Sequence, residues 1–320
     1  MPPVTETVPD AESSIIERAA ASVVRGTAMT LSSWTPLGTN VFDREWDLLV
    51  VFDTCRPDAM RAVADEYDFL STVETTTSVA SITYEWTAAT FTERHAETIG
   101  QTGFVSANGW PERVLTGSRP AEQFGAGWAP TRRETVDESQ LGAHVPAWRY
   151  GDGRGGESYL PQAAADTVVD LTIDLGRNRS LDRLIAHFIE PHYPFPSATA
   201  ARDGDQLSQS EQEPWTFIHN GGDPSVVWDH YLTELRAGLD AVERLLENVD
   251  ADRVLLTADH GERFGEWGRW GHTAGSFNPA LRRVPLVTTT ATDEETASPT
   301  IGTPDMALDV RDNLESLGYV

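Results

Sequence analysis

Residues 257–262 read Thr-Ala-Asp-His-Gly-Glu, and His272 follows them. The run 253–257, Arg-Val-Leu-Leu-Thr, is apolar in its centre and lies just before a glycine, which predicts a short buried strand. Open α/β sheets bind ligands beyond the carboxyl ends of their strands, where Asp259 and His260 would lie. A carboxylate beside an imidazole suits a divalent cation such as Mn, Zn, Mg or Ca. The alternative is a solvated loop in which Asp259 caps a helix.

Two more predicted strands end in residues of the same kind. Residues 46–52, Trp-Asp-Leu-Leu-Val-Val-Phe, have the nearly continuous apolar character of a strand covered on both faces, and Asp53 follows them. Residues 184–189, Leu-Ile-Ala-His-Phe-Ile, predict a strand that leads into a proline-bracketed turn holding His192. Asp53 could instead cap the helix predicted after it. Together the three strand ends gather Asp and His side chains, which bind metals or oxyanions.

Four segments of the chain resemble, in order, the alkaline phosphatase and sulfatase superfamily. The resemblance implies an α/β fold that is doubly wound around a mostly parallel central sheet, with helices on both faces. It runs from about residue 46 to the C-terminus and is weakest at 110–180. Two helices also match, 231–246 before the Asp-His strand and 308–318 at the end of the chain. The four segments are 48–58 (Leu-Leu-Val-Val-Phe-Asp-Thr-Cys-Arg-Pro-Asp), 188–195 (Phe-Ile-Glu-Pro-His-Tyr-Pro-Phe), 257–272, and 282–287 (Arg-Arg-Val-Pro-Leu-Val).

The resemblance also implies the roles of the site residues. Asp53, Asp259 and His260 would bind one divalent metal ion together with the nucleophile oxygen. His192 and His272 would hold the oxyanion or the leaving group of a small anionic ester. The two-metal phosphatases of the superfamily need a further histidine near the C-terminus, and no histidine follows His272, so we expect one metal.

The nucleophile has two candidates, Ser81 and Thr83. Sulfatases carry Cys or Ser followed by x-Pro-Ser-Arg, with a Thr-Gly nine residues after the Cys or Ser. Thr90 lies nine residues after Ser81, and this spacing favours Ser81. Thr83 is the alternative, because related phosphotransferases use threonine. The Pro, Ser and Arg of the signature are missing, so we expect no formylglycine.

A hydroxyl is a weak nucleophile that a neighbouring metal ion activates. The start of a helix, predicted here over 85–99, would add favourable amides and dipole. Either hydroxyl could instead be an ordinary helix cap.

The chief interpretation is a metal-dependent hydrolase of sulfate or phosphate esters that works through a covalent Ser or Thr intermediate. Two alternatives remain open: a phosphotransferase of the same superfamily, which passes the group to an alcohol, and a non-catalytic binding protein on this fold.

Composition indicates an acidic, salt-adapted protein. The 320 residues carry a net charge of −26, and all 24 basic residues are arginine. The acids are dispersed along the chain, as in the proteomes of extreme halophiles, and we therefore expect a halophilic archaeal source. Nucleic acid and anionic membranes would be poor partners. A single cysteine excludes an internal disulfide, no apolar run is long enough for a membrane span, and the first thirty residues lack a signal-peptide core, which predicts a cytoplasmic protein.

The chain divides simply. Residues 1–40 are expected to form an N-terminal extension and 41–320 one α/β domain, with an insertion near 111–160 over the edge of the active site. A polar loop is expected at 197–224, followed by a helix that Asp223 and Pro224 begin. Cys55 is interpreted as a small apolar residue behind the first strand, and Arg56 as an anion ligand or one half of a salt bridge.

Overall fold

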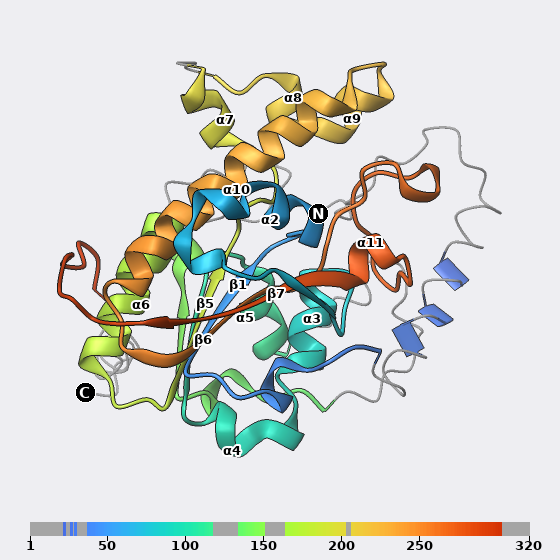
Figure 1. The fold of residues 1–320 in the computed structure, drawn as a ribbon. Coiled ribbons are helices and arrows are strands. Elements are labelled where there is room, and N and C mark those ends of the chain that lie inside the picture. The colour runs from blue at the N-terminus through green and yellow to red at the C-terminus, as the bar shows by residue number, and fades with distance from the viewer. Residues whose placement is uncertain are drawn as a thin grey trace, which may run out of the picture.

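The computed structural model describes residues 37–117, 134–150, 164–202 and 206–302, with isolated positions between 22 and 30. Its centre is one seven-stranded sheet with the strand order β2-β7-β6-β1-β5-β3-β4. Figure 1 labels β1, β5, β6 and β7 of this sheet. The strands are β1 (Leu48–Phe52), β2 (Glu74–Thr77), β3 (Thr102–Ser106), β4 (Ala143–Pro146), β5 (Arg183–Phe188), β6 (Ala251–Ala258) and β7 (Arg283–Ala291).

The middle of the sheet is parallel. β1 pairs in parallel with both β5 and β6, and Phe52 at its carboxyl end lies opposite Phe188 and Ala258. β3 continues the parallel order to β4, while β7 runs antiparallel to β6 and to β2. The carboxyl ends of β1, β5 and β6 therefore meet at one edge. The doubly wound, mostly parallel α/β fold expected from the sequence is confirmed.

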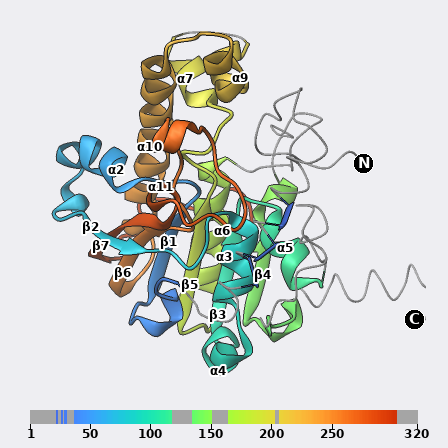
Figure 2. The same cartoon turned by 90° about the vertical axis from the view of Figure 1, so that its right-hand side faces the viewer.

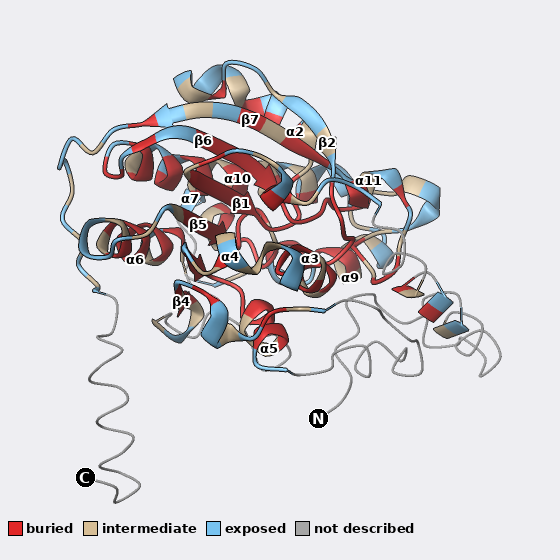
Figure 3. Ribbon diagram, turned by 90° about the horizontal axis from the view of Figure 1, so that it is seen from below, coloured by how far each residue is buried: buried red, intermediate tan, exposed pale blue. Residues whose placement is uncertain are grey.

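Helices cover both faces of this sheet. Because successive side chains of a strand point to opposite faces, Leu48 and Val50 of β1 pack in the core cluster with α2, α6 and α10, while Leu49 and Val51 pack in the cluster with α3. Figure 3 shows β1 and β5 buried between these layers, and β6 buried except near its start. The helices are α2 (Pro57–Val63), α3 (Thr83–Thr90), α4 (Ala96–Ile99), α5 (Trp110–Leu115), α6 (Ala165–Asn178), α7 (Pro196–Ala201), α8 (Gln209–Gln212), α9 (Pro214–His219), α10 (Pro224–Leu246) and α11 (Pro279–Arg282). Short 3-10 turns are η1 (Val41–Asp43), η2 (Ala64–Glu66), η3 (Asp68–Leu70), η4 (Glu93–His95), η6 (Glu138–Gln140), η7 (Ala147–Tyr150) and η8 (Glu266–Gly268).

The longest described helix, α10, projects beyond the sheet. It begins where expected, with the Asp223 side chain accepting a hydrogen bond from the Ser225 amide. Its first half carries α7, α8 and α9 on the far side from α4 (Figure 2). The polar loop expected at 197–224 is therefore wrong, because its described residues form three short helices. Glu211 is fully buried there and accepts hydrogen bonds from the Arg202 guanidinium, which gives the polar segment an internal anchor.

Helix α3 is shorter than the predicted helix over 85–99. It begins at Thr83 and ends at Thr90, because Phe91 leaves helical geometry and packs against Phe104 with ring centroids 4.8 Å apart. The Phe91 carbonyl then accepts a hydrogen bond from the Val136 amide, so the chain pairs with a distant segment instead of continuing the helix.

The expected insertion near 111–160 contains α5 and β4, and β4 is an edge strand of the sheet. Residues 118–133 and 151–163 lie outside the described residues, as do the predicted C-terminal helix 308–318 and most of the extension 1–40. Among the residues that are described, no helix has the length and apolarity needed to cross a membrane.

Candidate metal centre and nucleophile

Asp53 leaves the end of β1 through a strained turn. Its side chain is 1% exposed, and Thr54 after it has a φ of +65°, a left-handed conformation that is uncommon for a β-branched residue. The turn directs the Thr54 amide at Asp259 Oδ1, 3.2 Å away. Tyr231 of α10 holds the other side of the turn, because its hydroxyl donates to the Thr54 carbonyl at 2.7 Å and accepts from the Arg56 amide at 3.2 Å. The strained residue Thr54 thus connects the end of β1 to Asp259 at the end of β6.

Asp259 and His260 follow β6 and are fully buried. Asp259 Oδ1 also accepts a hydrogen bond from the His260 amide at 2.7 Å. His260 Nδ1 lies 2.8 Å from the Gly261 carbonyl, and since a carbonyl can only accept, Nδ1 carries the proton. The lone pair is therefore on Nε2, which lies 3.5 Å from Asp53 Oδ1 and 3.6 Å from Asp259 Oδ2.

These three side chains fit a cation. One ligand atom from each of Asp53, Asp259 and His260 lies within 4.8 Å of the other two. Asp53 Oδ1 and Asp259 Oδ2 are buried and accept no hydrogen bond from any described residue. A buried acceptor left without a partner is costly, and two carboxylates with an imidazole lone pair between them match the donor set of a divalent metal ion.

The electrostatics agree with this geometry. Burial, and then the neighbouring Asp259 carboxylate, raises the pKa of Asp53 to about 6, and burial raises the pKa of Asp259 to about 7. Burial, and then the charge of His272, lowers the pKa of His260, which favours its neutral, metal-binding form. The raised pKa values mean that the site disfavours two negative charges, which a bound cation would offset.

Thr83 lies against this cluster. It is the first residue of α3, it is 4% exposed, and its hydroxyl lies 3.3 Å from Asp53 Oδ2 and 3.5 Å from His260 Nε2. Asn108 Nδ2 donates to the same Asp53 oxygen at 2.8 Å and lies 3.5 Å from the Thr83 hydroxyl. The Thr83 oxygen therefore lies beside the space that the carboxylates and the imidazole enclose.

Ser81 lies elsewhere. Its hydroxyl is 2.9 Å from Glu85 Oε2 and 3.0 Å from the Thr273 carbonyl, and it accepts a hydrogen bond from the Ser276 amide at 3.0 Å. Each of these partners belongs to α3 or to the loop after His272. The structure thus brings Thr83 to the candidate metal centre and joins Ser81 to a backbone loop.

Two further histidines complete the surroundings. The rings of His272 and His260 are 4.7 Å apart, and those of His272 and His192 are 5.3 Å apart. His272 is 2% exposed and donates through Nδ1 to Glu262 Oε2 at 2.7 Å. Burial alone would raise the pKa of Glu262, but the charge of His272 and the hydrogen bond from it outweigh burial, so the pKa of Glu262 lies below its usual value. Glu262 thus fixes the orientation of His272.

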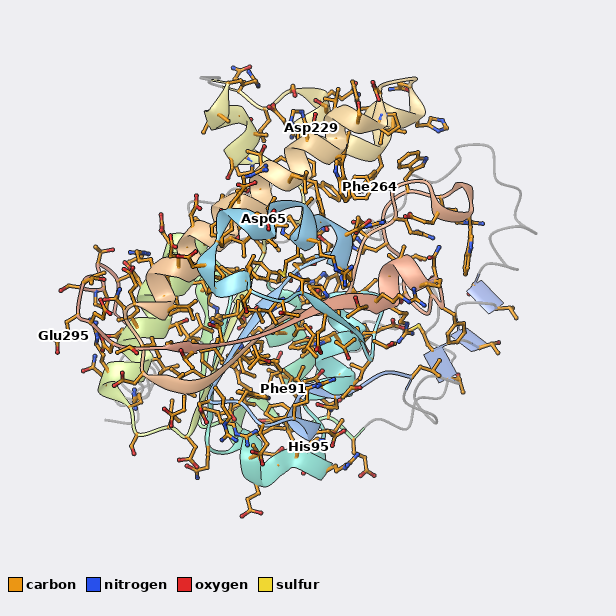
Figure 4. All side chains as sticks on the ribbon, viewed as in Figure 1. Asp65, Phe91, His95, Asp229, Phe264 and Glu295 are labelled. Atoms are coloured by element: carbon orange, nitrogen blue, oxygen red, sulfur yellow. The ribbon has the colours of Figure 1, made fainter. Side chains whose placement is uncertain are left out.

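Arg56 and Cys55 have structural surroundings. The Arg56 guanidinium pairs with Asp58 and with Glu266, each at 2.7 Å, and lies 5.7 Å from the ring of Phe264. Figure 4 labels Phe264 at the end of the molecule that carries α8 and α9. Of the two alternatives for Arg56, the salt bridge is the one formed. Cys55 is fully buried in the main core cluster, as interpreted.

Two neighbours of the site were missed by the sequence reasoning. Asn108 follows β3, so the strand-end rule used for Asp53 could have found it. His187 lies inside β5, fully buried, with Nδ1 3.0 Å from the Ser106 hydroxyl and Nε2 3.9 Å from Asp259 Oδ2. Burial, and then His260, lowers the pKa of His187 to about 3, so it is neutral. A histidine within an apolar strand gives no signal that separates it from the core.

Comparison with known proteins adds likenesses of shape. No protein-family model matches the chain, and no curated protein does. Among solved structures, the phosphoethanolamine transferase EptA from Neisseria meningitidis is 15% identical, with a TM-score of 0.48 over 79% of this chain, which spans 48% of that one. The 2-O GAG sulfatase BT1596 is 12% identical, with a TM-score of 0.42 over 78% of this chain and 65% of that one.

A protein of the alkaline phosphatase superfamily from Vibrio parahaemolyticus is 9% identical, with a TM-score of 0.40 over 90% of this chain and 72% of that one. The chain thus spans about half the length of the EptA transferase and most of the Vibrio protein. At these TM-scores and identities, none of the likenesses carries an inference about activity.

Proposed function

We propose that this chain is a metal-dependent enzyme of the alkaline phosphatase and sulfatase superfamily that cleaves sulfate or phosphate esters through a covalent intermediate on Thr83. One observation carries the proposal. The Thr83 hydroxyl lies 3.3 Å from Asp53 and 3.5 Å from His260, two members of the only group of three potential ligands found among the described residues. A structural helix cap would not need a buried carboxylate and an imidazole lone pair at this distance.

Each residue has a part in the reaction. Asp53, Asp259 and His260 would hold the cation, which when bound lowers the pKa of the neighbouring hydroxyl and makes it a stronger nucleophile. Thr83 Oγ1 forms a bond to the sulfur or phosphorus as the bond to the ester oxygen breaks. Its proton passes to Asp53 Oδ2, which already accepts its hydrogen bond. The ester oxygen leaves with a proton from His272.

The second half of the reaction releases Thr83. Water, or an alcohol, displaces the threonine oxygen from the transferred group and loses a proton to His272, while Thr83 regains its proton from Asp53. Water gives a hydrolase and an alcohol gives a transferase. The transferase is a second candidate because the Thr83 hydroxyl, not that of Ser81, lies beside Asp53 and His260, and related phosphotransferases of the superfamily use threonine.

A substrate screen at high salt tests the proposal. Aryl sulfate, aryl phosphate and aryl phosphodiester are offered to the protein with Mn, Zn, Mg or Ca, with and without an added alcohol acceptor. We expect metal-dependent release of the aryl alcohol and, on rapid acid quenching, a sulfo or phospho group on the peptide that contains Thr83. Absence of turnover and adduct with every metal and ester would favour the non-catalytic binding protein.

A further inference from the structure

One buried carboxylate connects the loop that carries His272 to the start of α3. Glu85 is 1% exposed, although it carries a carboxyl group and lies in the first turn of the helix. Its Oε1 accepts a hydrogen bond from the Gly275 amide at 2.9 Å. Its Oε2 accepts from the Ser81 amide at 3.3 Å and from the Ser81 hydroxyl at 2.9 Å. The two oxygens of one side chain thus bind two segments that are far apart in the sequence.

Ser81 adds a second connection between the same segments. Its oxygen accepts from the Ser276 amide at 3.0 Å, and its proton is shared between Glu85 and the Thr273 carbonyl, 3.0 Å away. Gly275 has a φ of +66°, a conformation that favours glycine, and in this turn its amide faces Glu85. We call these contacts of Ser81 and Glu85 with residues 273–276 the latch.

The latch lies between two residues of the proposed reaction. Glu85 is two residues after Thr83, and Gly275 is three residues after His272. We infer that Glu85 is a positioning residue, which fixes His272 relative to Thr83 by holding the loop after His272 against α3. The inference rests on the proposed function for the roles of these two residues, but the latch itself can be measured without any substrate.

A carboxylate suits this place better than its neutral isostere. Among the described residues, three donors point at Glu85, two amides and one hydroxyl, and the two oxygens of a carboxylate accept all three. Glutamine has one oxygen, so its NH2 group would face either the Gly275 amide or the Ser81 amide, and a donor facing a donor makes no hydrogen bond. Glu85→Gln therefore opens one half of the latch while keeping the volume of the side chain.

Hydrogen exchange measures the latch directly. We expect amides of residues 273–276 to exchange faster in Glu85→Gln than in the wild type, while amides of β1 and β6 exchange at the same rate. The matched control is Asp170→Asn in α6. Asp170 is also a buried carboxylate that accepts a backbone hydrogen bond, from Thr300 at 2.9 Å, but it holds a different segment. Unchanged exchange at residues 273–276 in Glu85→Gln would overturn the latch.

Kinetics on the ester that the wild type turns over test positioning. We expect kcat of Glu85→Gln to fall about 10- to 100-fold, as for other residues that orient a reacting group, with little change in KM and the same metal content. In a His272→Ala background the same substitution should have almost no further effect, because the residue it positions is gone. An equal loss in both backgrounds would overturn action through His272, and faster exchange with unchanged kcat would overturn the positioning role.

Ser81→Ala is a second variant should Glu85→Gln not fold. It removes the Ser276 and Thr273 contacts but leaves the Glu85 bond to Gly275, so residues 273–276 should exchange at an intermediate rate; wild-type exchange there would overturn the latch. If no ester is turned over by the wild type, the proposed function fails while hydrogen exchange still decides whether the latch exists.

Discussion

Two hydroxyls two residues apart, on Ser81 and Thr83, lie in different surroundings. The Thr83 oxygen lies next to carboxylates and an imidazole lone pair, whereas the Ser81 oxygen lies next to loop amides and one carboxylate. In an extended strand, residues i and i+2 point to the same side. Here Ile82 is extended and Thr83 is already helical, so the two side chains separate. Spacing in the sequence cannot distinguish a nucleophile from a structural hydroxyl at such a junction.

The largest effect should come from Thr83→Ala. If Thr83 is the attacking oxygen, turnover should fall by about three orders of magnitude or more, because the covalent route is lost. Ser81→Ala should cost far less, through the latch alone. Steady-state kinetics of the two variants, with Thr83→Ser as the conservative control, decide between them. A large loss in Ser81→Ala beside near-normal Thr83→Ala would reverse the assignment.

The next largest effect should be on metal affinity, which should fall when a residue beside Thr83 is replaced but not when a residue beside Ser81 is replaced. Asp259→Asn should weaken binding of the divalent ion about 100-fold, since it removes a charged ligand, whereas Glu85→Gln should leave affinity unchanged. In the wild type, metal at about 100 times its Kd should stabilise the fold by about 2.7 kcal/mol, and a chelator should reverse this. Calorimetric titration measures the affinities. Asp252→Asn, exposed on the same strand, is the control. Equal affinities in Asp259→Asn and wild type would contradict the ligand assignment.

Added salt should change the stability of the fold through the charged surface, and not through the surroundings of Ser81 or Thr83. The acidic side chains behind the net charge of −26 repel one another. Salt screens this repulsion, because the screening length falls from about 10 Å at 0.1 M to about 3 Å at 1 M. Tm should therefore rise by several degrees with added KCl, in the wild type and in Thr83→Ala alike. Scanning calorimetry across salt concentrations measures it, and a flat or falling curve speaks against the salt-adapted interpretation.

The smallest effect should come from Arg202→Ala, far from α3. The Arg202 guanidinium holds the pKa of Glu211 down at about 2, so its contribution to stability is present above pH 4.5 and is lost as the pH falls towards 2. The variant should be slightly less stable than the wild type near neutral pH, because Arg202 is half exposed and solvent screens the ion pair, and the difference should shrink as the pH falls towards 2. Urea unfolding across this range measures the difference, and kcat should not change. A difference that grows as the pH falls would contradict the assignment.

The strands that carry the site could be predicted because their apolar runs are continuous. β1, β5 and β6 are where the sequence places them; Asp53 and Asp259 directly follow β1 and β6, and His192 lies in the turn after β5. Their convergence follows from parallel order alone. The metal and proton-transfer roles of Asp53, Asp259, His260, His192 and His272 remain predictions that the geometry accommodates.

The surroundings of α3 could not be predicted in the same way. The end of the helix depends on Phe91 packing against Phe104, a contact between distant segments. Glu85 looks like any acidic residue in a first helical turn until the Gly275 amide is seen to face it. Tertiary contacts determine both the end of α3 and the partners of Glu85, and the local sequence pattern carries no information about such contacts.

The left-handed turn at Thr54 connects α10 to the candidate metal centre formed by Asp53, Asp259 and His260. Tyr231 of α10 holds that turn, and the turn aims the Thr54 amide at Asp259. We therefore expect docking of α10 and preorganisation of this centre to be coupled. Linkage is reciprocal, so an ion that binds more tightly to the preorganised centre must favour the docked helix by the same coupling free energy. Slower proteolysis in α10 would then report on occupancy of a site whose ligands the helix itself does not supply.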